Sequence, residues 1–216
     1  MNEEADRGPT EWNGSVGVGP WVGEWPGDQH LDPELLAAGD RRNVVDRYRY
    51  WTVEAIVADL DQRRHPFHVA IENLGHDFNI GSIVRTANAF LAAEVHIVGR
   101  RRWNRRGAMV TDRYQHLRHH DDVTSLTAFA HERGLPIVAV DNGPGAVPLE
   151  TSLLPGPCLL LFGQEGPGLS AQARAAAVQT VSIAQFGSTR SINVGVAAGI
   201  AMHAWIRQHA DPGAAE

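Results

Sequence analysis

Residues 73–90, NLGHDFNIGSIVRTANAF, combine one arginine and several polar side chains with apolar residues at helical spacing. Asn79 precedes the first apolar residue and has a side chain that suits a helix N-cap. At about 100° per residue, the apolar face comprises Ile80, Ile83, Val84, Ala87, Phe90 and Leu91, and the polar face comprises Gly81, Ser82, Arg85 and Asn88. Gly81 lies one turn before Arg85 and leaves room beside it for a ligand. A helix N-terminus and a guanidinium can together hold an anion such as a phosphodiester, although a surface arginine on an amphipathic helix has the same spacing.

The stretch LLFGQEGPGLS, residues 160–170, runs from apolar residues into a loop with three glycines, one proline and the carboxylate of Glu165. Its glycine order differs from the dinucleotide-binding pattern G-x-G-x-x-G, and it lacks the lysine of a P-loop. A loop so bare of side chains indicates that something approaches the main chain closely. The carboxylate argues against phosphate as that ligand. A simple turn at the end of a strand is the other interpretation.

Residues 182–205, SIAQFGSTRSINVGVAAGIAMHAW, join a strand to a helix through the polar turn GSTRS. We expect the helix to begin at Ser191 or Ile192, with Asn193 in its first turn. Each glycine inside a helix costs roughly 1 kcal/mol relative to alanine. Close packing against another helix or backbone explains such glycines better than a cofactor-binding role. The small residues of this helix are Gly195, Ala197, Ala198, Gly199 and Ala201.

All 19 basic residues are arginines, so Schiff-base chemistry and a P-loop lysine are excluded. The net charge of −6 argues against a protein that simply coats nucleic acid. Five arginines nevertheless surround one tryptophan in RRRWNRR, residues 100–106, which we call the arginine loop. This density favours contacts with phosphates and a stacked base over a solvated loop. The candidate RNA-contacting residues are Arg100, Arg101, Arg102, Trp103, Arg105 and Arg106.

A chain of 216 residues with 43% hydrophobic content can bury one substantial core. No apolar run reaches the roughly 18 residues of a membrane span, and the first residues lack a signal-peptide pattern. We therefore expect a cytoplasmic protein without membrane contacts. The single cysteine, Cys158, excludes an internal disulfide and is predicted to be a small buried hydrophobic residue rather than a reactive thiol.

The elements that must position these residues begin with a change of pattern near residue 31. Two helices are predicted before the main domain, DPELLAAGD with Pro33 at its first position and Gly39 at its end, and TVEAIVADLDQRR behind a threonine cap. We divide the chain into an irregular arm rich in glycine, proline and tryptophan, a helical extension, a main domain and a tail, at residues 1–30, 31–65, 66–209 and 210–216.

Within the main domain, short β-type runs alternate with helices. The predicted strands are FHVAIEN, EVHIVG, PIVAVD, PCLLLF and TVSIA. The predicted helices are NIGSIVRTANAFLA, SLTAFAHERG, LSAQARAAA and SINVGVAAGIAMHAWIRQ. This alternation predicts an α/β domain with a mainly parallel sheet that is covered by helices on both faces. Ligands of such sheets bind in the loops at the carboxyl ends of the strands.

Taken together and in this order, the three stretches resemble the three motifs of the SpoU/TrmH family of RNA ribose 2′-O-methyltransferases, in the SPOUT superfamily. The first resembles N-x-G-x-x-x-R-x-A-x-x-F through Asn79, Gly81, Arg85, Ala87 and Phe90. The second resembles G-x-E-G-x-G-L through Gly163, Glu165, Gly166, Gly168 and Leu169. The third resembles S-L-N-V-x-x-A through Ser191, Asn193, Val194 and Ala197, with Ile192 in place of the usual leucine. The resemblance covers roughly residues 66–208.

The resemblance implies a SPOUT fold whose C-terminal segment threads through a loop to make a deep trefoil knot, which general rules of chain connection would not suggest. It implies S-adenosylmethionine as the cofactor, held mostly by main chain, and a homodimer with RNA across the subunit interface. We expect no metal. Gly163, Ile183 and Ile192 match the family's cofactor contacts. The full candidate cofactor set is Val140, Phe162, Gly163, Gly166, Ile183, Gln185 and Ile192.

Methylation of a ribose hydroxyl requires that its proton is removed or that the developing alkoxide is stabilised. Arg85 is the catalytic candidate by its motif position, but arginine does not ordinarily give up a proton. We expect Arg85 to bind the phosphate beside the target ribose and to stabilise the oxyanion, and to act as a base only if that phosphate reorganises its proton. Asn79, Ser191 and Asn193 would orient Arg85 and the ribose. Glu165 would aim the guanidinium or hold the cofactor loop, with general-base action as the less favoured role.

Two other functions are compatible with the same motifs. One is an RNA-binding module that keeps the methyltransferase scaffold without turnover. The other is a SPOUT enzyme that methylates a base, although the arginine of the first motif and the S-x-N-V pattern favour ribose. Transfer RNA and ribosomal RNA are both candidate substrates.

Overall fold

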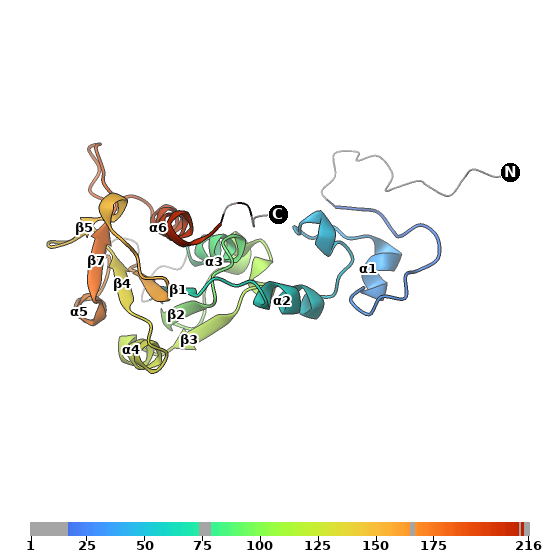
Figure 1. Cartoon of the computed structure of the whole chain (residues 1–216), viewed down its shortest axis with the longest axis horizontal. Helices are drawn as coiled ribbons and strands as arrows, with labels where there is room; N and C mark the ends of the chain where they lie inside the picture. The colour runs from blue at the N-terminus through green and yellow to red at the C-terminus, as the bar shows by residue number, and fades with distance from the viewer. Residues whose placement is uncertain (1–16, 74–78, 165–166, 212, 214–216) are drawn as a thin grey trace. The chain divides into compact units, whose positions relative to one another are not determined.

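The computed structural model describes residues 17–73, 79–164, 167–211 and 213 of the chain (Figure 1). The chain consists of two compact units, Met1–Gln62 and Arg63–Glu216. Among the described residues, no helix is long and apolar enough to cross a membrane.

The larger unit is built on a seven-stranded sheet with the order β3-β2-β1-β6-β4-β7-β5. Every strand pair in it is parallel, which confirms the predicted α/β class with a mainly parallel sheet. The strands are β1 (Phe67–Asn73), β2 (Val95–Gly99), β3 (Leu117–His120), β4 (Ile137–Val140), β5 (Val147–Pro148), β6 (Cys158–Phe162) and β7 (Gln179–Ser182).

Helices cover both faces of this sheet (Figure 1). Helices α3 (Ile80–Ala89) and α6 (Val194–His209) share a hydrophobic core with alternate residues of β1, among them Phe67. A second core on the opposite face joins α4 (Val123–Glu132) and α5 (Ala171–Ala176) to the intervening residues of the strands. Three short 3-10 turns connect elements of this unit, η2 (Arg105–Ala108), η3 (Thr111–Arg113) and η4 (Leu149–Thr151).

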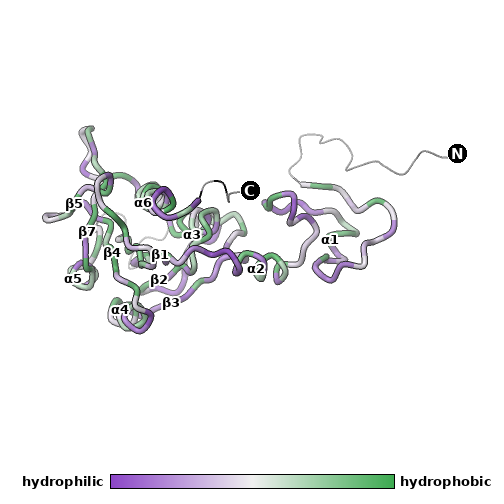
Figure 2. The backbone as a smooth tube through the Cα atoms, viewed as in Figure 1, coloured by the Kyte–Doolittle hydropathy of each residue, from purple (hydrophilic) through white to green (hydrophobic). Residues whose placement is uncertain are grey.

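All five predicted strands and all four predicted helices of the main domain are present, whereas β3 and β5 were not predicted. Strand β3 has the sequence LRHH, which offers no run of apolar residues because the strand lies at the edge of the sheet. Figure 2 shows this contrast between the mostly hydrophilic β3 and the hydrophobic β4. Cys158 is fully buried in β6, and this burial raises the pKa of its thiol to about 12, as expected for a structural cysteine.

The smaller unit contains α1 (Pro33–Ala38), the 3-10 turn η1 (Asp46–Tyr48) and α2 (Val53–Asp61). Both predicted helices are present: the Asp32 side chain caps α1 and the Thr52 side chain caps α2. Gly39 ends α1 with a positive φ of 88°, which favours glycine. In the arm, the ring of Trp21 packs edge-on against Tyr50, and the Trp21 amide donates to the Leu36 carbonyl of α1 at 2.8 Å, so this part of the arm lies on its own unit. Trp12 lies outside the described residues.

Candidate active site

A cavity of about 400 Å³ lies beside the carboxyl ends of β4 and β6 and the N-terminus of α6. Parallel sheets bind ligands at this end of their strands. The predicted cofactor residues that line it are Val140, Phe162, Gly163, Ile183, Gln185 and Ile192. Ser191 and Asn193 line it too. Gly166 and Glu165 lie outside the described residues. The structure therefore brings the second and third motifs together around one cavity.

The loop after β6 folds back on itself at Gly163. A Cβ atom at Gly163 would lie only 2.2 Å from the carbonyl carbon of Gly168 and 2.3 Å from the Leu169 nitrogen. The Gly168 amide donates to the Gln164 carbonyl at 3.1 Å, and Gly168 has a φ of +71°. The absence of a side chain at Gly163 thus lets the loop close on its own main chain, and the closed loop forms one wall of the cavity.

The N-termini of α3 and α6 are joined by one hydrogen bond between asparagines. The Asn193 Nδ2 donates to the Asn79 Oδ1 at 2.9 Å. The Asn193 Oδ1 accepts from the amides of Gly195 and Val196, so Asn193 is the N-cap of α6. The prediction that this helix begins at Ser191 or Ile192 is wrong for this reason. Asn79 occupies the N-cap position of α3, as predicted, but its side chain makes no capping hydrogen bond.

The glycines of α6 face α3, as close helix packing predicted. A Cβ atom at Gly195 would lie 3.6 Å from both the Asn79 Oδ1 and the Ser82 Cβ. A Cβ atom at Gly199 would lie 3.8 Å from the Thr86 Cγ2. The two helices therefore approach closely at these glycines.

Gly81 has a different neighbour from the one predicted. It is buried, and a Cβ atom on it would lie 2.7 Å from the Ala108 nitrogen and 2.8 Å from the Gly107 Cα. The space beside this turn of α3 is thus filled by the end of η2, and the idea that it is open to a ligand is wrong. Gly81 instead lets the segment that follows the arginine loop dock on the helix.

Arg85 is exposed on α3 and lies outside the lining of the 400 Å³ cavity. It borders a separate cavity of about 380 Å³. The other residues around that cavity are Ser82, Thr86, Ala89, Phe90 and Gly107. The structure therefore connects the first motif to the cofactor cavity through Asn79, while Arg85 faces a neighbouring surface beside the segment that follows the arginine loop.

The arginine loop is anchored by Asn73, a buried residue at the end of β1. The Asn73 Nδ2 donates to the carbonyl oxygens of Arg100 at 2.6 Å and Arg102 at 3.1 Å. The arginines are exposed, whereas Trp103 is half-buried and packs against the core. The Arg105 guanidinium lies 5.5 Å from the Trp103 ring centroid. The packing of Trp103 against the core thus helps to hold the loop in place, while the arginine side chains are exposed to solvent.

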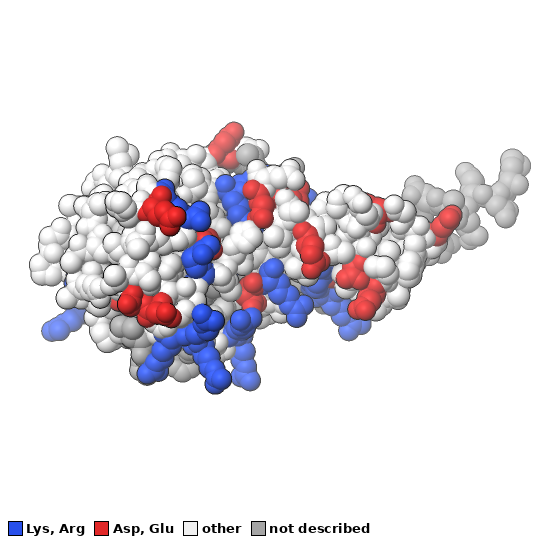
Figure 3. Space-filling view, turned by 90° about the horizontal axis from the view of Figure 1, so that it is seen from below, with Lys and Arg blue, Asp and Glu red and all other residues white. Residues whose placement is uncertain are grey.

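On the face drawn in Figure 3, several basic side chains lie along the lower edge, with acidic side chains near them. All of these basic groups are arginines, because the chain has no lysine.

Three charged residues near the cavity were not predicted from the sequence as part of the site. Asp141 directly follows β4 and lines the cavity, and the Arg174 Nη1 donates to its Oδ2 at 2.8 Å. Glu72 is buried in β1, and its Oε2 accepts from the Ser170 amide at 2.7 Å, just beyond the glycine loop. The position of Asp141 at a strand's carboxyl end was a usable signal, whereas Glu72 sits inside an otherwise apolar strand.

Two proteins with related sequences are methyltransferases. The chain is 28% identical over 163 residues to the tRNA (guanosine(18)-2′-O)-methyltransferase of Escherichia coli K12, covering 74% of this chain and 71% of that protein. It is 29% identical over 166 residues to the enzyme of the same name from Thermus thermophilus, covering 73% of this chain and 83% of that protein.

Solved structures share the fold of the larger unit. The TrmH/SpoU tRNA modifying enzyme of A. aeolicus superposes with a TM-score of 0.64 at 23% identity, over 72% of this chain and 81% of that one. The SpoU methyltransferase AviRb of Streptomyces viridochromogenes, in complex with the cofactor AdoMet, superposes with a TM-score of 0.62 at 25% identity. This match covers 69% of the chain, which spans 60% of AviRb.

The family model described as SpoU rRNA Methylase matches residues 66–203, which contain all three motifs and every residue that lines the 400 Å³ cavity. The chain therefore belongs to the SpoU rRNA methylase family, as its three motifs predicted.

Proposed function

We propose that the chain is an S-adenosylmethionine-dependent methyltransferase that methylates the 2′-hydroxyl of a ribose in tRNA or rRNA. The observation that carries this proposal is the cavity in which the residues of the second and third motifs meet. Two relatives named for 2′-O-methylation of a tRNA guanosine support ribose as the target. Detection of methyl transfer from S-adenosylmethionine to RNA tests the proposal.

The cavity suits S-adenosylmethionine in size and lining. Its volume of about 400 Å³ lies within the usual range for small-molecule sites. Val140, Phe162 and Ile192 offer apolar surface for an adenine ring, and the closed glycine loop offers main-chain groups. The Asp141 carboxylate is available to accept hydrogen bonds from hydroxyl or amino groups. The bound cofactor supplies a methyl group on a cationic sulfur.

The residues of the first and third motifs would act on the RNA. Asn193 donates a hydrogen bond to Asn79 beside the cavity, and this bond would orient the Ser191–Asn193 turn for the incoming ribose. Arg85 would bind the phosphate next to that ribose through its fork of N–H donors and stabilise the oxyanion as the hydroxyl proton leaves. We expect Glu165 to act in the glycine loop, by aiming the Arg85 guanidinium or by holding the cofactor.

We further propose that the chain works as a homodimer. Val196 and Ile200 are 54% and 39% exposed and lie one turn apart on α6, and a second copy would cover them. A dimer also offers a way for Arg85 of one subunit to approach the cavity of the other, since in a single chain Arg85 does not line that cavity.

We also propose that residues 66–209 form the methyltransferase domain, with the C-terminal segment threaded as a trefoil knot. The family match over residues 66–203 and the superposition on SpoU methyltransferases support this proposal. The arm, the extension at residues 31–65 and the tail at residues 210–216 would lie outside the catalytic domain.

The exposed arginines of the arginine loop would contact RNA phosphates. In the double variant Arg101→Ala/Arg106→Ala, we expect RNA affinity to fall. Each lost phosphate contact should also reduce the slope of log affinity against log salt by about 0.7–0.9. Filter binding at several salt concentrations measures this slope, and calorimetry with S-adenosylmethionine should show unchanged cofactor affinity.

The variant Arg41→Ala/Arg207→Ala is the matched control, because it also removes two exposed arginines. Its salt slope should stay close to that of the wild type. Equal slopes for the two double variants would contradict a specific role of the arginine loop and leave only the general charge of the surface.

A further inference from the structure

Three histidines form a hydrogen-bonded row across neighbouring strands. The His68 Nδ1 in β1 lies 2.9 Å from the His96 Nε2 in β2, and the His96 Nδ1 lies 2.9 Å from the His120 Nε2 in β3. His96 has no exposed surface, and the ring of Phe129 from α4 packs against all three imidazoles. None of the three lines the cofactor cavity.

Burial lowers the pKa of His96 to about 2 and also lowers the pKa of His68 and of His120 below the ordinary histidine value. A neutral imidazole has one nitrogen with a free lone pair, which is the form that binds metal ions.

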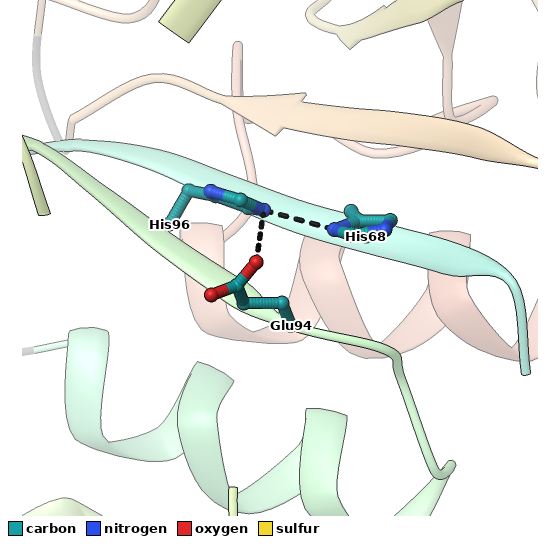
Figure 4. A group of neighbouring side chains, drawn as sticks. All are labelled: His68, Glu94 and His96. Carbon is teal, nitrogen blue, oxygen red and sulfur yellow. Dashed lines mark hydrogen bonds and ion pairs between the residues drawn. The ribbon is translucent and has the colours of Figure 1, made fainter. Parts of the chain in front are cut away.

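A carboxylate completes this group. The Glu94 Oε2 lies 3.9 Å from the His96 Nε2, while the Glu94 Oε1 accepts from the Arg118 Nε at 3.0 Å. One ligand atom from each of His68, Glu94 and His96 falls within 4.8 Å of the other two (Figure 4). The register of β1 against β2, with Val69 opposite Val95, brings His68 beside Glu94 despite their separation in sequence.

We propose that His68, Glu94 and His96 bind one divalent transition-metal ion such as Zn²⁺. Two imidazole nitrogens and one carboxylate oxygen are a common zinc ligand set, with water in the remaining position. Zinc–nitrogen bonds of 2.0–2.1 Å in tetrahedral geometry place two ligand nitrogens roughly 3.3 Å apart. The His68 and His96 nitrogens, at 2.9 Å, need to separate by only a few tenths of an ångström.

The surrounding groups suit such a site. If the His96 Nε2 binds the ion, its Nδ1 carries the proton and donates to the His120 Nε2, which orients the His96 ring. Arg118 holds one oxygen of Glu94 and leaves the other for the ion. His68 would then carry its proton on Nε2 and offer its Nδ1 lone pair to the ion.

The position of the site separates it from methyl transfer. His68 lies near the amino end of β1, and Glu94 and His96 lie at the amino end of β2, whereas the cofactor cavity lies at the carboxyl ends of β4 and β6. The ion would therefore link β1 to β2 and stabilise this edge of the sheet. It would take no part in methyl transfer.

Metal binding can be measured on the full-length protein after treatment with a chelator and dialysis. We expect one Zn²⁺ per chain in a competition titration with a chromophoric chelator, and a visible absorption band with Co²⁺. His68→Gln and Glu94→Gln should each lower the Zn²⁺ affinity by about tenfold or more. The control His131→Gln, at an exposed histidine of α4, should bind like the wild type.

A second readout is the unfolding temperature, because an ion that binds only the folded state raises it by mass action. Zn²⁺ should raise the unfolding temperature of the wild type and of His131→Gln, but not that of His68→Gln. If the wild type binds no stoichiometric ion, or if His68→Gln and Glu94→Gln bind as tightly as His131→Gln, the row is only a chain of hydrogen-bonded imidazoles. Calorimetry with S-adenosylmethionine on the same preparations reports folding and cofactor binding independently of the metal.

Discussion

Replacement of Arg85 by alanine is expected to lower the rate of methyl transfer to RNA by about 10²–10³-fold, the loss typical of removing one donor that stabilises a transition-state oxyanion. The side chain is exposed on α3 and lines no part of the cofactor cavity. The variant should therefore fold normally, since surface substitutions usually change the free energy of unfolding by less than about 0.5 kcal/mol. Single-turnover kinetics with saturating cofactor measures the rate.

Arg85→Lys separates charge from geometry at the same position. Lysine keeps the positive charge but lacks the planar fork that binds a phosphate through two hydrogen bonds, so we expect an intermediate rate. Calorimetry should give the wild-type affinity for S-adenosylmethionine in both variants. Wild-type methylation by Arg85→Ala, with normal cofactor binding, would show that the assigned role of Arg85 is wrong.

Gly163→Ala is expected to lower the affinity for S-adenosylmethionine by at least about 100-fold. The new methyl group would lie 2.2 Å from the Gly168 carbonyl carbon. The atoms in the way belong to the backbone, which cannot move aside as easily as the end of a flexible side chain. The glycine loop would therefore have to open, and the cavity would lose this wall. Calorimetry with S-adenosylmethionine measures the loss.

Two further glycines test this explanation. Gly168→Ala has ordinary contacts but forces alanine to a φ of +71°, at a cost of roughly 1–2 kcal/mol. It should fold and bind the cofactor about tenfold more weakly. Gly156→Ala meets no atom within 4 Å and should behave like the wild type. Unchanged cofactor affinity in Gly163→Ala would contradict the closed loop as part of the site.

One helix connects the parts of the proposed site. Helix α3 presents Asn79 to Asn193 at the cavity, Gly81 to the segment behind the arginine loop, and Arg85 to the outer surface. RNA held by the arginine loop and by Arg85 would thus be positioned by the same element that contacts the third motif.

The sequence predicted most of the sheet because strands and helices depend on local patterns. Apolar runs such as CLLLF predict central strands, and the carboxyl ends of parallel strands lie at one edge wherever the strands are found. The described cofactor candidates, from Val140 to Ile192, followed from the resemblance to the family motifs, and they line one cavity.

The errors concern contacts between segments that are distant in the sequence. Helical spacing places Gly81 on a polar face, but only the folded chain shows that Gly107 and Ala108 cover it. Asn79 stands at the N-cap position, yet its side-chain oxygen accepts a hydrogen bond from Asn193, 114 residues away in the sequence. The histidine row has no local motif, because its members come from three separate strands.

The most direct test of the proposed function is the position of the transferred methyl group. The purified protein is incubated with S-adenosylmethionine that carries a labelled methyl group and with RNA from cells that lack its gene, and the RNA is then digested to nucleosides. We expect label in one 2′-O-methylated nucleoside, and far less of it with Arg85→Ala over the same time. Label on a base, or no transfer to RNA by a protein that binds the cofactor, would contradict it.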